Sequence, residues 1–460
     1  MFLCPLTTDT RYLFALLAEL KFMIRRIAML SVHTCPLATL GGKETGGMNV
    51  YVRDLSRELS RRGIAVDVFT RSQNPTIPRL STGRLGDSGR VIHIPAGPER
   101  PYNKNLVFDH LPEFVGRVKE FAWQERLEYD LIHSHYWLSG WAALDLRAAW
   151  HVPVIQMFHT LGEMKNRVAQ TPEERESSRR IEVEGQIMRL ADRLIAATPL
   201  EKGQMSWLYG ADADKISVVP AGVDLNLFHP IPRAEARKQI GVPPHHRMIL
   251  FVGRIQPLKG IDTLMRAMKQ VISQYPELRE DLCVTIIGGD PDPVSELEQT
   301  EFERLKRLRA ELGIGDLVTF LGAKDQDTLV YYYSAAEMVV MPSHYESFGM
   351  VALEAMACGT PVIGSDVGGL SFSIEDGFNG FLVPGQDPDA LASKIALLLR
   401  HPALRDHLGE QAIRWAERYA WPHIADEILD VYALVLAGSA SARASWRPVG
   451  EGLQPTQTRW

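Results

Sequence analysis

The sequence contains few cysteines and has no excess of basic residues. Its cysteines are Cys4, Cys35, Cys283 and Cys358, and no two of them form a C-x-x-C pair. This spacing offers neither a disulfide framework nor a zinc site, and it favours a reducing, cytoplasmic location. The formal net charge of -6 leaves no broad basic excess to neutralise the phosphates of a nucleic acid, so a nucleic-acid partner is not expected.

Long apolar runs are also absent. No run approaches the roughly 18 to 20 residues that a membrane-spanning helix needs, so we expect no transmembrane segment. The stretch before Arg25 is broken by four charged residues and lacks the ordered regions of a signal peptide. Residues 1–22 are expected to be an extension that is either disordered or not translated, with Met23 as the alternative start. Their apolar patches leave loose peripheral contact with a membrane open.

The alternation of β-rich and helical segments predicts an α/β protein. A length of 460 residues with 45% hydrophobic content is enough for two or three domains. Many of the β-rich runs are nearly continuously apolar, which is typical of parallel strands buried on both faces. The predicted strands are Ile27–Val32, Ile64–Thr70, Val91–Pro95, Leu131–His135, Val154–Phe158, Leu194–Thr198, Met248–Gly253, Val284–Gly288, Leu317–Leu321, Met338–Met341, Pro361–Ser365 and Phe381–Pro384. Two such β/α blocks predict two Rossmann-like domains with ligands at the carboxyl ends of the strands.

Loop composition predicts where these domains begin and end. The link between them falls at residues 220–232, which have little periodicity and contain Gly222, Asp224 and Asn226. The predicted units are an N-terminal domain (23–225), a C-terminal domain (226–415), a helix that packs back on the first domain (416–437) and a disordered tail (438–460).

The most informative segment is residues 341–369, which read MPSHYESFGMVALEAMACGTPVIGSDVGG. Glu346 and Glu354 lie eight residues apart around a turn of small residues, and a helix is predicted from Met350 to Cys358. The free N–H groups at the start of that helix favour a phosphate, with a carboxylate on each side to accept hydroxyl hydrogen bonds. An ordinary amphipathic helix with two solvated glutamates is the alternative.

A second element is Gly253 to Gly260, which follows a predicted strand. Arg254 and Lys259 lie five residues apart in it and are able to hold one diphosphate, whereas solvated surface cations are the alternative.

A third element is the glycine-rich stretch 41–49. It has Gly-Met where a P-loop has Lys-Ser/Thr, and it lacks the G-x-G-x-x-G spacing. A nucleoside triphosphatase and a nicotinamide-dependent dehydrogenase are therefore both disfavoured.

The segment with both glutamates resembles the E-x7-E signature of retaining glycosyltransferases of the GT-B fold, because the flanking MPS, SFG, ALEAMACGTPVI and GG elements occur in order. The resemblance implies two Rossmann-like domains that face a central cleft, and a hexosyltransferase that uses a UDP-linked donor. The implied donor-binding residues are Gly47, Arg254, Lys259, Glu346, Phe348, Gly349 and Glu354. The implied catalytic residues are His159, Arg254, Lys259 and Glu346.

Four further segments narrow the resemblance. They are SVHTCPL (31–37), GGMNVYV (46–52), HSHYWLSG (133–140) and His159-Thr160. They resemble the D-inositol-3-phosphate glycosyltransferases over residues 24–436, and several positions are shared with sucrose-phosphate synthases. Inositol 3-phosphate and fructose 6-phosphate are therefore both open as acceptors, as are lipids and polysaccharides. The implied acceptor-binding residues are His33, Asn49, Lys104, Tyr136, Thr160, Lys165 and Arg180. Arg179 is an equally basic alternative to Arg180.

The resemblance also implies a mechanism without a covalent intermediate. The leaving diphosphate accepts the proton of the acceptor on the same face of the sugar, and Arg254 and Lys259 stabilise the charge that develops. The D-x-D pair Asp290 and Asp292 lies in a proline-containing turn, so no cofactor or essential metal is expected, although Mg²⁺ stays open. A non-catalytic sugar-binding protein is the remaining alternative, and a homodimer is left open.

Overall fold

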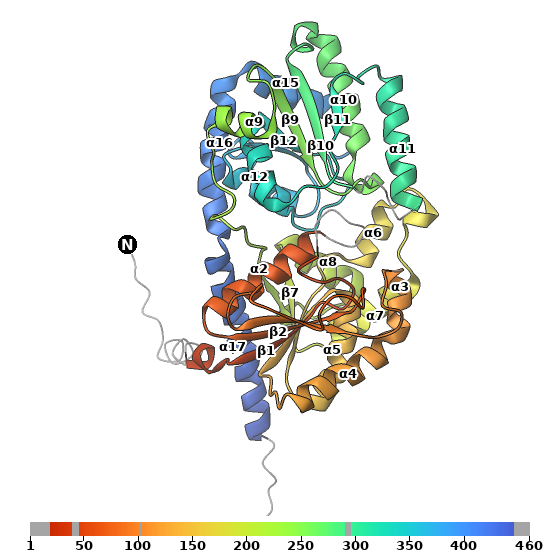
Figure 1. Cartoon of the computed structure of the whole chain (residues 1–460), viewed down its shortest axis with the longest axis vertical. Coiled ribbons are helices and arrows are strands. Elements are labelled where there is room, and N and C mark those ends of the chain that lie inside the picture. The colour runs from red at the N-terminus through yellow and green to blue at the C-terminus, as the bar shows by residue number, and fades with distance from the viewer. Residues whose placement is uncertain (1–18, 39–45, 102, 290–295, 446–460) are drawn as a thin grey trace, which may run out of the picture.

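The structure is a computed structural model that describes residues 19–38, 46–101, 103–289 and 296–445. Most of the glycine-rich stretch 41–49, the pair Asp290 and Asp292, and the predicted tail from 446 onward fall outside these residues. Figure 1 shows two α/β units, one above the other, each built around a sheet with helices packed against it.

The first unit contains an eight-stranded sheet in the order β3-β4-β2-β1-β5-β6-β7-β8. All neighbouring strands pair in parallel except β3 and β4. The strands are β1 (Arg26–Leu30), β2 (Ala65–Arg71), β3 (Leu80–Thr82), β4 (Gly89–Ile94), β5 (Leu131–His135), β6 (Val154–Met157), β7 (Arg193–Ala196) and β8 (Ile216–Val218). The helices are α2 (Gly47–Arg61), α3 (Lys104–Val107), α4 (Leu111–Gln124), α5 (Tyr136–Trp150), α6 (Gly162–Val168), α7 (Ser178–Leu190) and α8 (Pro199–Tyr209).

The second unit contains a six-stranded parallel sheet in the order β11-β10-β9-β12-β13-β14. The strands are β9 (Arg247–Val252), β10 (Leu282–Ile287), β11 (Val318–Phe320), β12 (Met338–Met341), β13 (Val362–Ser365) and β14 (Gly380–Val383). The helices are α9 (Arg233–Ile240), α10 (Ile261–Gln274), α11 (Glu296–Glu311), α12 (Gln326–Ala335), α13 (Met350–Ala357), α14 (Leu370–Ser373), α15 (Pro388–Arg400) and α16 (Pro402–Ala416).

The strands predicted from apolar runs all correspond to strands of the structure, because the central strands are buried on both faces as parallel sheets require. All residues of β5 and β12 are buried, for example. The short strands β3 and β8 were not predicted. β3 is a three-residue edge strand with mostly exposed side chains, so its sequence carries little apolar signal.

The last helix, α17 (Trp421–Ser445), returns to the first unit. It packs against α2, and the hydroxyl of Tyr432 lies 2.8 Å from Nδ1 of His133 in β5. Figure 1 shows it descending along that unit. The prediction that the disordered tail starts at 438 differs from the structure, because α17 continues to Ser445. Residues 437–445 contain alanine and arginine, which favour helix, beyond a helix that is already anchored by packing.

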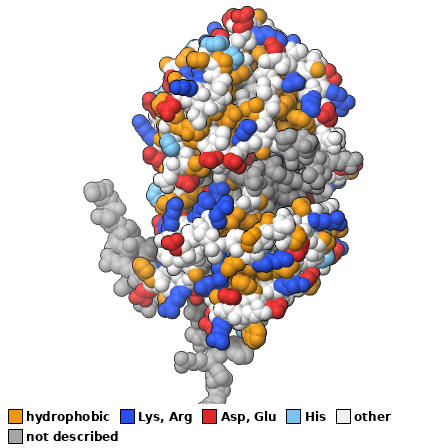
Figure 2. All heavy atoms as spheres, viewed as in Figure 1, with side chains coloured by type: hydrophobic (Ala, Val, Ile, Leu, Met, Phe, Trp, Pro, Cys, Tyr) orange, Lys and Arg blue, Asp and Glu red, His pale blue; other side chains and the backbone are white. Residues whose placement is uncertain are grey.

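The N-terminal extension, predicted to be disordered or not translated, is helical at its end. Residues 19–23 are helical, and Lys21 forms an ion pair with Asp430 of α17 at 2.6 Å. Among the described residues, no helix combines the length and apolarity needed to cross a membrane. Figure 2 shows acidic, basic and hydrophobic side chains interspersed over the face that it presents, without one dominant sign of charge.

Candidate active site

Every site residue predicted from the sequence except Arg180 lines a cleft between the two units. Neighbouring strands of each sheet end at this cleft: β1, β5, β6 and β7 in the first unit, and β9, β10 and β12 in the second. The carboxyl ends of parallel strands lie at one edge of a sheet, so residues far apart in the sequence meet there. The first unit lines the cleft with His33, Gly47, Asn49, Lys104, Tyr136, His159, Thr160 and Lys165. The second unit lines it with Arg254, Lys259, Glu346, Phe348, Gly349 and Glu354.

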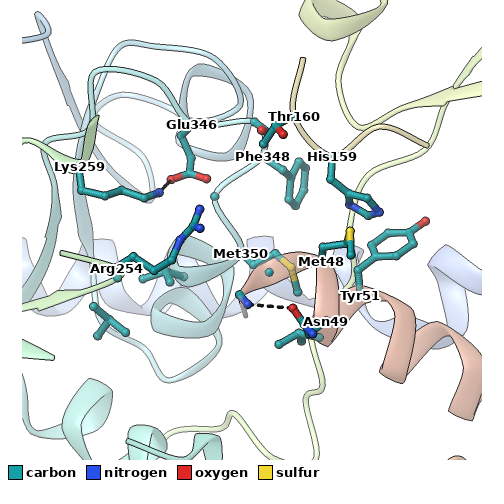
Figure 3. A pocket seen from close by; sticks show the side chains of 18 of the residues that line it. Met48, Asn49, Tyr51, His159, Thr160, Arg254, Lys259, Glu346, Phe348 and Met350 are labelled. Carbon is teal, nitrogen blue, oxygen red and sulfur yellow. Dashed lines mark hydrogen bonds and ion pairs between the residues drawn. The ribbon is translucent and has the colours of Figure 1, made fainter. Parts of the chain in front are cut away.

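Lys259 and Glu346 form an ion pair on the wall of the second unit. The Lys259 ammonium donates to the Glu346 carboxylate, and Figure 3 shows Arg254 beside the pair. Lys259 ends a short 3-10 turn at Gly260, where φ is +64° and an added Cβ would lie 2.1 Å from the carbonyl oxygen of Pro342. Because only glycine fits there, the turn holds the lysine next to the segment that carries Glu346.

The start of α13 also faces the cleft. Gly349 precedes this helix with φ +90°, a left-handed conformation that glycine adopts without strain. Phe348, Gly349 and Met350 all line the cleft. The unpaired N–H groups of a first helical turn favour an anion. The second unit therefore presents a helix N-terminus, Arg254 and Lys259 to the same cleft, which suits an anionic ligand.

Glu354 lies further along α13 and accepts hydrogen bonds on both oxygens. Gln326 donates to Oε1 at 3.0 Å, and the Tyr333 hydroxyl donates to Oε2 at 2.7 Å. Burial raises the pKa of Glu354 to about 7, because a buried carboxylate loses its hydration. The side-chain oxygen of Gln326 in turn accepts from Arg53 of the first unit at 2.6 Å. A chain of hydrogen bonds therefore joins the two units at Glu354.

Two residues of the first unit have positive φ angles at strand ends. Tyr136 follows β5 with φ +74°, and His159 follows β6 with φ +62°. Such angles are uncommon outside glycine, and the strain they carry gathers at functional sites. Nε2 of His159 lies 2.9 Å from Nδ1 of His135. Burial lowers the pKa of His159 to about 3, so its ring is uncharged near pH 7, and its predicted catalytic role stays a prediction.

His33 and Asn49 contribute to the cleft in different ways. Nδ1 of His33 is buried and has no hydrogen-bond partner within the described part of the chain, so it is available to a ligand. The Asn49 amide donates to the Thr34 hydroxyl and to the Cys35 carbonyl, both at 2.7 Å, and accepts from the backbone of Gly46 at 3.0 Å. Asn49 thus stabilises the turn before α2, and its contact with an acceptor stays a prediction.

Arg180, on α7, is the predicted site residue that does not line the cleft, and its side chain is fully buried. It donates to the Tyr136 hydroxyl at 2.9 Å, and to the carbonyl and hydroxyl of Thr160 at 2.8 and 3.1 Å. It also pairs with Glu184 at 2.7 Å and with Glu176 at 2.9 Å. These contacts involve all three nitrogens of the guanidinium. Arg180 therefore supports two cleft residues from behind.

Lys104 and Lys165 line the cleft and approach the same carboxylate. Lys165 donates a hydrogen bond to Glu176, and Lys104 lies 3.5 Å from it. Burial lowers the pKa of Lys165 to about 8. Arg179, the alternative to Arg180, is more than half exposed and pairs with Asp109 at 3.2 Å. The buried arginine, and not its neighbour, therefore joins the two lysines.

Sequence reasoning missed Arg53, Gln326 and Glu176. Nothing in the local sequence connects Arg53 with Gln326, which lies 273 positions away. A signal was available for Glu176, which precedes Arg180 by four residues and has the spacing of a helical ion pair.

Metal ligands are not gathered in the described residues, since no group of three or more His, Cys, Asp or Glu side chains there is arranged to hold an ion. The pair Asp290 and Asp292 lies outside those residues. On the described wall of the second unit, Arg254, Lys259 and Lys324 line the cleft together with the start of α13.

Known proteins resemble this chain along most of its length. The family described as Glycosyl transferases group 1 matches residues 232–415, and the family described as Glycosyltransferase Family 4 matches residues 45–227. D-inositol 3-phosphate glycosyltransferase 2 of Catenulispora acidiphila is 43% identical over 413 residues, which cover 89% of this chain and 95% of that protein. D-inositol 3-phosphate glycosyltransferase of Acidothermus cellulolyticus is 42% identical over 91% of this chain and 92% of its own.

A solved structure is also similar to this chain along most of its length. Sucrose-phosphate synthase from Thermosynechococcus elongatus superposes with a TM-score of 0.82 at 36% identity, covering 90% of this chain and all of the other. The predicted two-domain GT-B fold and the predicted glycosyltransferase class are both confirmed. The chain belongs to the group 1 glycosyltransferases and is an enzyme of that family.

Proposed function

We propose that the protein transfers a hexosyl or N-acetylhexosaminyl group from a UDP-linked sugar to a phosphorylated polyol or sugar, with retention of configuration. The observation that carries this proposal is the gathering of Lys104, Lys165 and Arg180 on the first unit. Lys104 and Lys165 line that wall with Arg180 behind them, which suits an acceptor phosphate, while Arg254 and Lys259 suit the donor diphosphate on the other wall. The names of the two relatives favour inositol 3-phosphate, and the likeness to a sucrose-phosphate synthase makes fructose 6-phosphate the second candidate.

The chemical step needs positioning and charge stabilisation. The diphosphate would lie at the start of α13, where Arg254 and Lys259 stabilise the negative charge that grows on it as the glycosidic bond breaks. Glu346 would accept hydrogen bonds from hydroxyls of the sugar, and Glu354 would accept them from hydroxyls of the ribose. The leaving diphosphate takes the proton of the attacking hydroxyl, so no protein side chain serves as a covalent nucleophile. The neutral ring of His159 would lie beside the sugar, where it orients the donor.

We propose no metal or other cofactor for this step, because cationic side chains and a helix N-terminus supply the positive charge that a bridging metal would give. Cys35, Cys283 and Cys358 are free, which supports a reducing, cytoplasmic location.

A phosphorylated acceptor is expected to react at least about tenfold faster, as kcat/KM, than its dephosphorylated form, because charge-assisted contacts are each worth about 1.5 to 3 kcal/mol. Inositol would be compared with inositol 3-phosphate, and fructose with fructose 6-phosphate, at one fixed UDP-sugar concentration. Mass spectrometry of pooled acceptors identifies the product. Equal rates with and without the phosphate would defeat the proposed acceptor class and leave the family assignment standing.

Donor affinity is expected to rise with pH through the titration of Glu354. Its pKa of about 7 lies above the usual value for glutamate, so the carboxyl is largely protonated at pH 6 and ionised at pH 8. An ionised carboxylate accepts hydrogen bonds from ribose hydroxyls on both oxygens. The protonated form has less acceptor capacity, because one oxygen carries a proton. Affinity for a UDP-linked sugar should increase about tenfold between these pH values if the ionised form alone binds it.

The same titration has an opposite effect on the free energy of unfolding. A glutamate whose pKa is raised by folding stabilises the native state only while it is protonated, so its contribution is lost as pH rises from about 4.3 to about 7.

The predicted pH dependence of donor affinity is measured by calorimetric titration of the UDP-linked sugar into the wild type and into Glu354→Gln from pH 6 to pH 8. Identical pH slopes for the two proteins would show that another group is responsible.

A further inference from the structure

Three cations of the first unit converge on one buried carboxylate. Lys165 donates a hydrogen bond to Oε1 of Glu176, Nη1 of Arg180 lies 2.9 Å from the same oxygen, and Nζ of Lys104 lies 3.5 Å from it. Only 6% of the Glu176 side chain is exposed. One oxygen atom surrounded by three cationic donors is also an arrangement that an oxygen of a phosphate would occupy.

These cations come from three different elements of the first unit. Lys104 lies on α3, Lys165 on α6 and Arg180 on α7, and both lysines line the cleft. Nζ of Lys104 also lies 5.7 Å from the centre of the Tyr136 ring. Glu176 therefore holds the position where the proposed function requires an acceptor phosphate.

The net charge of the site indicates whether Glu176 stays in place when a phosphate binds or is replaced by it. Glu184 is buried against Arg180 and stays with it, so with Glu176 in place the three cations retain one net positive charge. Without Glu176 they retain two. A phosphate monoester carries about -1.5 to -2 near pH 7. A phosphate added beside Glu176 would leave uncompensated negative charge in a buried site, whereas a phosphate that replaces Glu176 is balanced.

The backbone around Glu176 allows such a replacement without refolding. The N–H of Glu176 donates to the Asn166 side chain at 2.7 Å, and the Asn166 amide donates back to the Glu176 carbonyl at 3.4 Å. Ser177, the next residue, caps α7. Since the main chain is held on both sides, rotation of the Glu176 side chain is sufficient to release the three cations.

We propose that Glu176 is an internal ligand of the acceptor-phosphate subsite and that the phosphate of the acceptor displaces it from Lys104, Lys165 and Arg180. This inference rests on the proposed function, in which the acceptor is phosphorylated. Glu176 then determines specificity. A tethered carboxylate competes with any anion that enters, so free phosphate, which has no other contacts, is kept out. An acceptor that also binds through its ring hydroxyls displaces the carboxylate.

Glu176→Gln tests the proposal, because it removes the competing charge at nearly constant size. The KM for the phosphorylated acceptor is expected to fall about tenfold, and inorganic phosphate should inhibit at an about tenfold lower concentration, as expected when one charge-assisted competitor is removed. The KM for the donor, which the second unit is proposed to bind, should not change. Glu173→Gln is the matched control, since Glu173 is exposed in the same segment.

A readout independent of activity is the rise in melting temperature that inorganic phosphate produces, which should be larger for Glu176→Gln than for the wild type. If Glu176→Gln does not fold, Glu176→Asp retains the charge but shortens the side chain, and its phosphate affinity should rise by a smaller factor. Unchanged or weaker phosphate binding in the variant, with a wild type that prefers the phosphorylated acceptor, would overturn this inference alone. Loss of that preference in both proteins would overturn the proposed acceptor class as well.

Discussion

Replacing Lys259 with alanine is expected to slow sugar transfer by about 10² to 10³-fold, the scale of losing one preorganised charge donor in an active site. Lys259 lines the cleft on a turn fixed by Gly260, and its ammonium pairs with Glu346. The substitution has two consequences. It removes a cation from the proposed diphosphate site, and it leaves the Glu346 carboxylate without its partner, where it repels the same diphosphate.

The measurement is kcat/KM for the donor at saturating acceptor, together with the melting temperature of each variant. Lys238→Ala is the control, because Lys238 is an exposed lysine on α9 of the same unit, and it should leave transfer unchanged. A folded Lys259→Ala enzyme with activity within a few-fold of the wild type would refute the role assigned to Lys259.

The meeting of Lys259 and Glu346 illustrates what the sequence could predict. The two residues are 87 positions apart, yet each follows a strand recognised from its apolar run, β9 or β12. These strands are neighbours in the sheet, and the carboxyl ends of parallel strands share one edge. Strand positions together with the resemblance to retaining glycosyltransferases therefore predict one site for both residues.

Other features depend on tertiary packing and could not be predicted in this way. The convergence on Glu176 involves α3, α6 and α7, and the relative placement of three helices is not encoded in any local pattern. The link from Arg53 through Gln326 to Glu354 depends on how the two units meet. Strand β3 was missed because an exposed edge strand of three residues has no apolar run to recognise.

For Arg180, the sequence predicted the residue but not its burial. The resemblance identified it as a ligand of the acceptor phosphate, but the sequence could not show that its guanidinium is fully buried and engaged by four residues. Helix α7 begins at Ser178, and successive residues on a helix point in directions about 100° apart. Arg179 is therefore directed to solvent while Arg180 enters the core, a difference that two adjacent arginines do not reveal.

Arg180→Ala is consequently expected to destabilise the protein by about 3 kcal/mol or more, and not only to reduce the preference for a phosphorylated acceptor. Breaking a buried ion pair by removing one partner typically costs about 3 to 5 kcal/mol, because an uncompensated charge is left behind. Here two carboxylates are affected, Glu184 with a fully buried side chain and Glu176 with 6% exposure. Both keep other donors, such as the N–H of Gly162 at 3.0 Å from Glu184, which is why the lower end of the range is expected.

Urea unfolding of Arg180→Ala and Arg179→Ala measures this difference directly. Arg179 is the matched control because it differs by one position, is mostly exposed, and pairs only with the exposed Asp109 among the acidic residues that the structure describes. Its loss should change the free energy of unfolding by less than about 1 kcal/mol. Equal destabilisation by the two substitutions would contradict the buried position of Arg180. A large loss confined to Arg180→Ala would establish that Tyr136 and Thr160, which line the cleft, owe their positions to a buried guanidinium that does not line it.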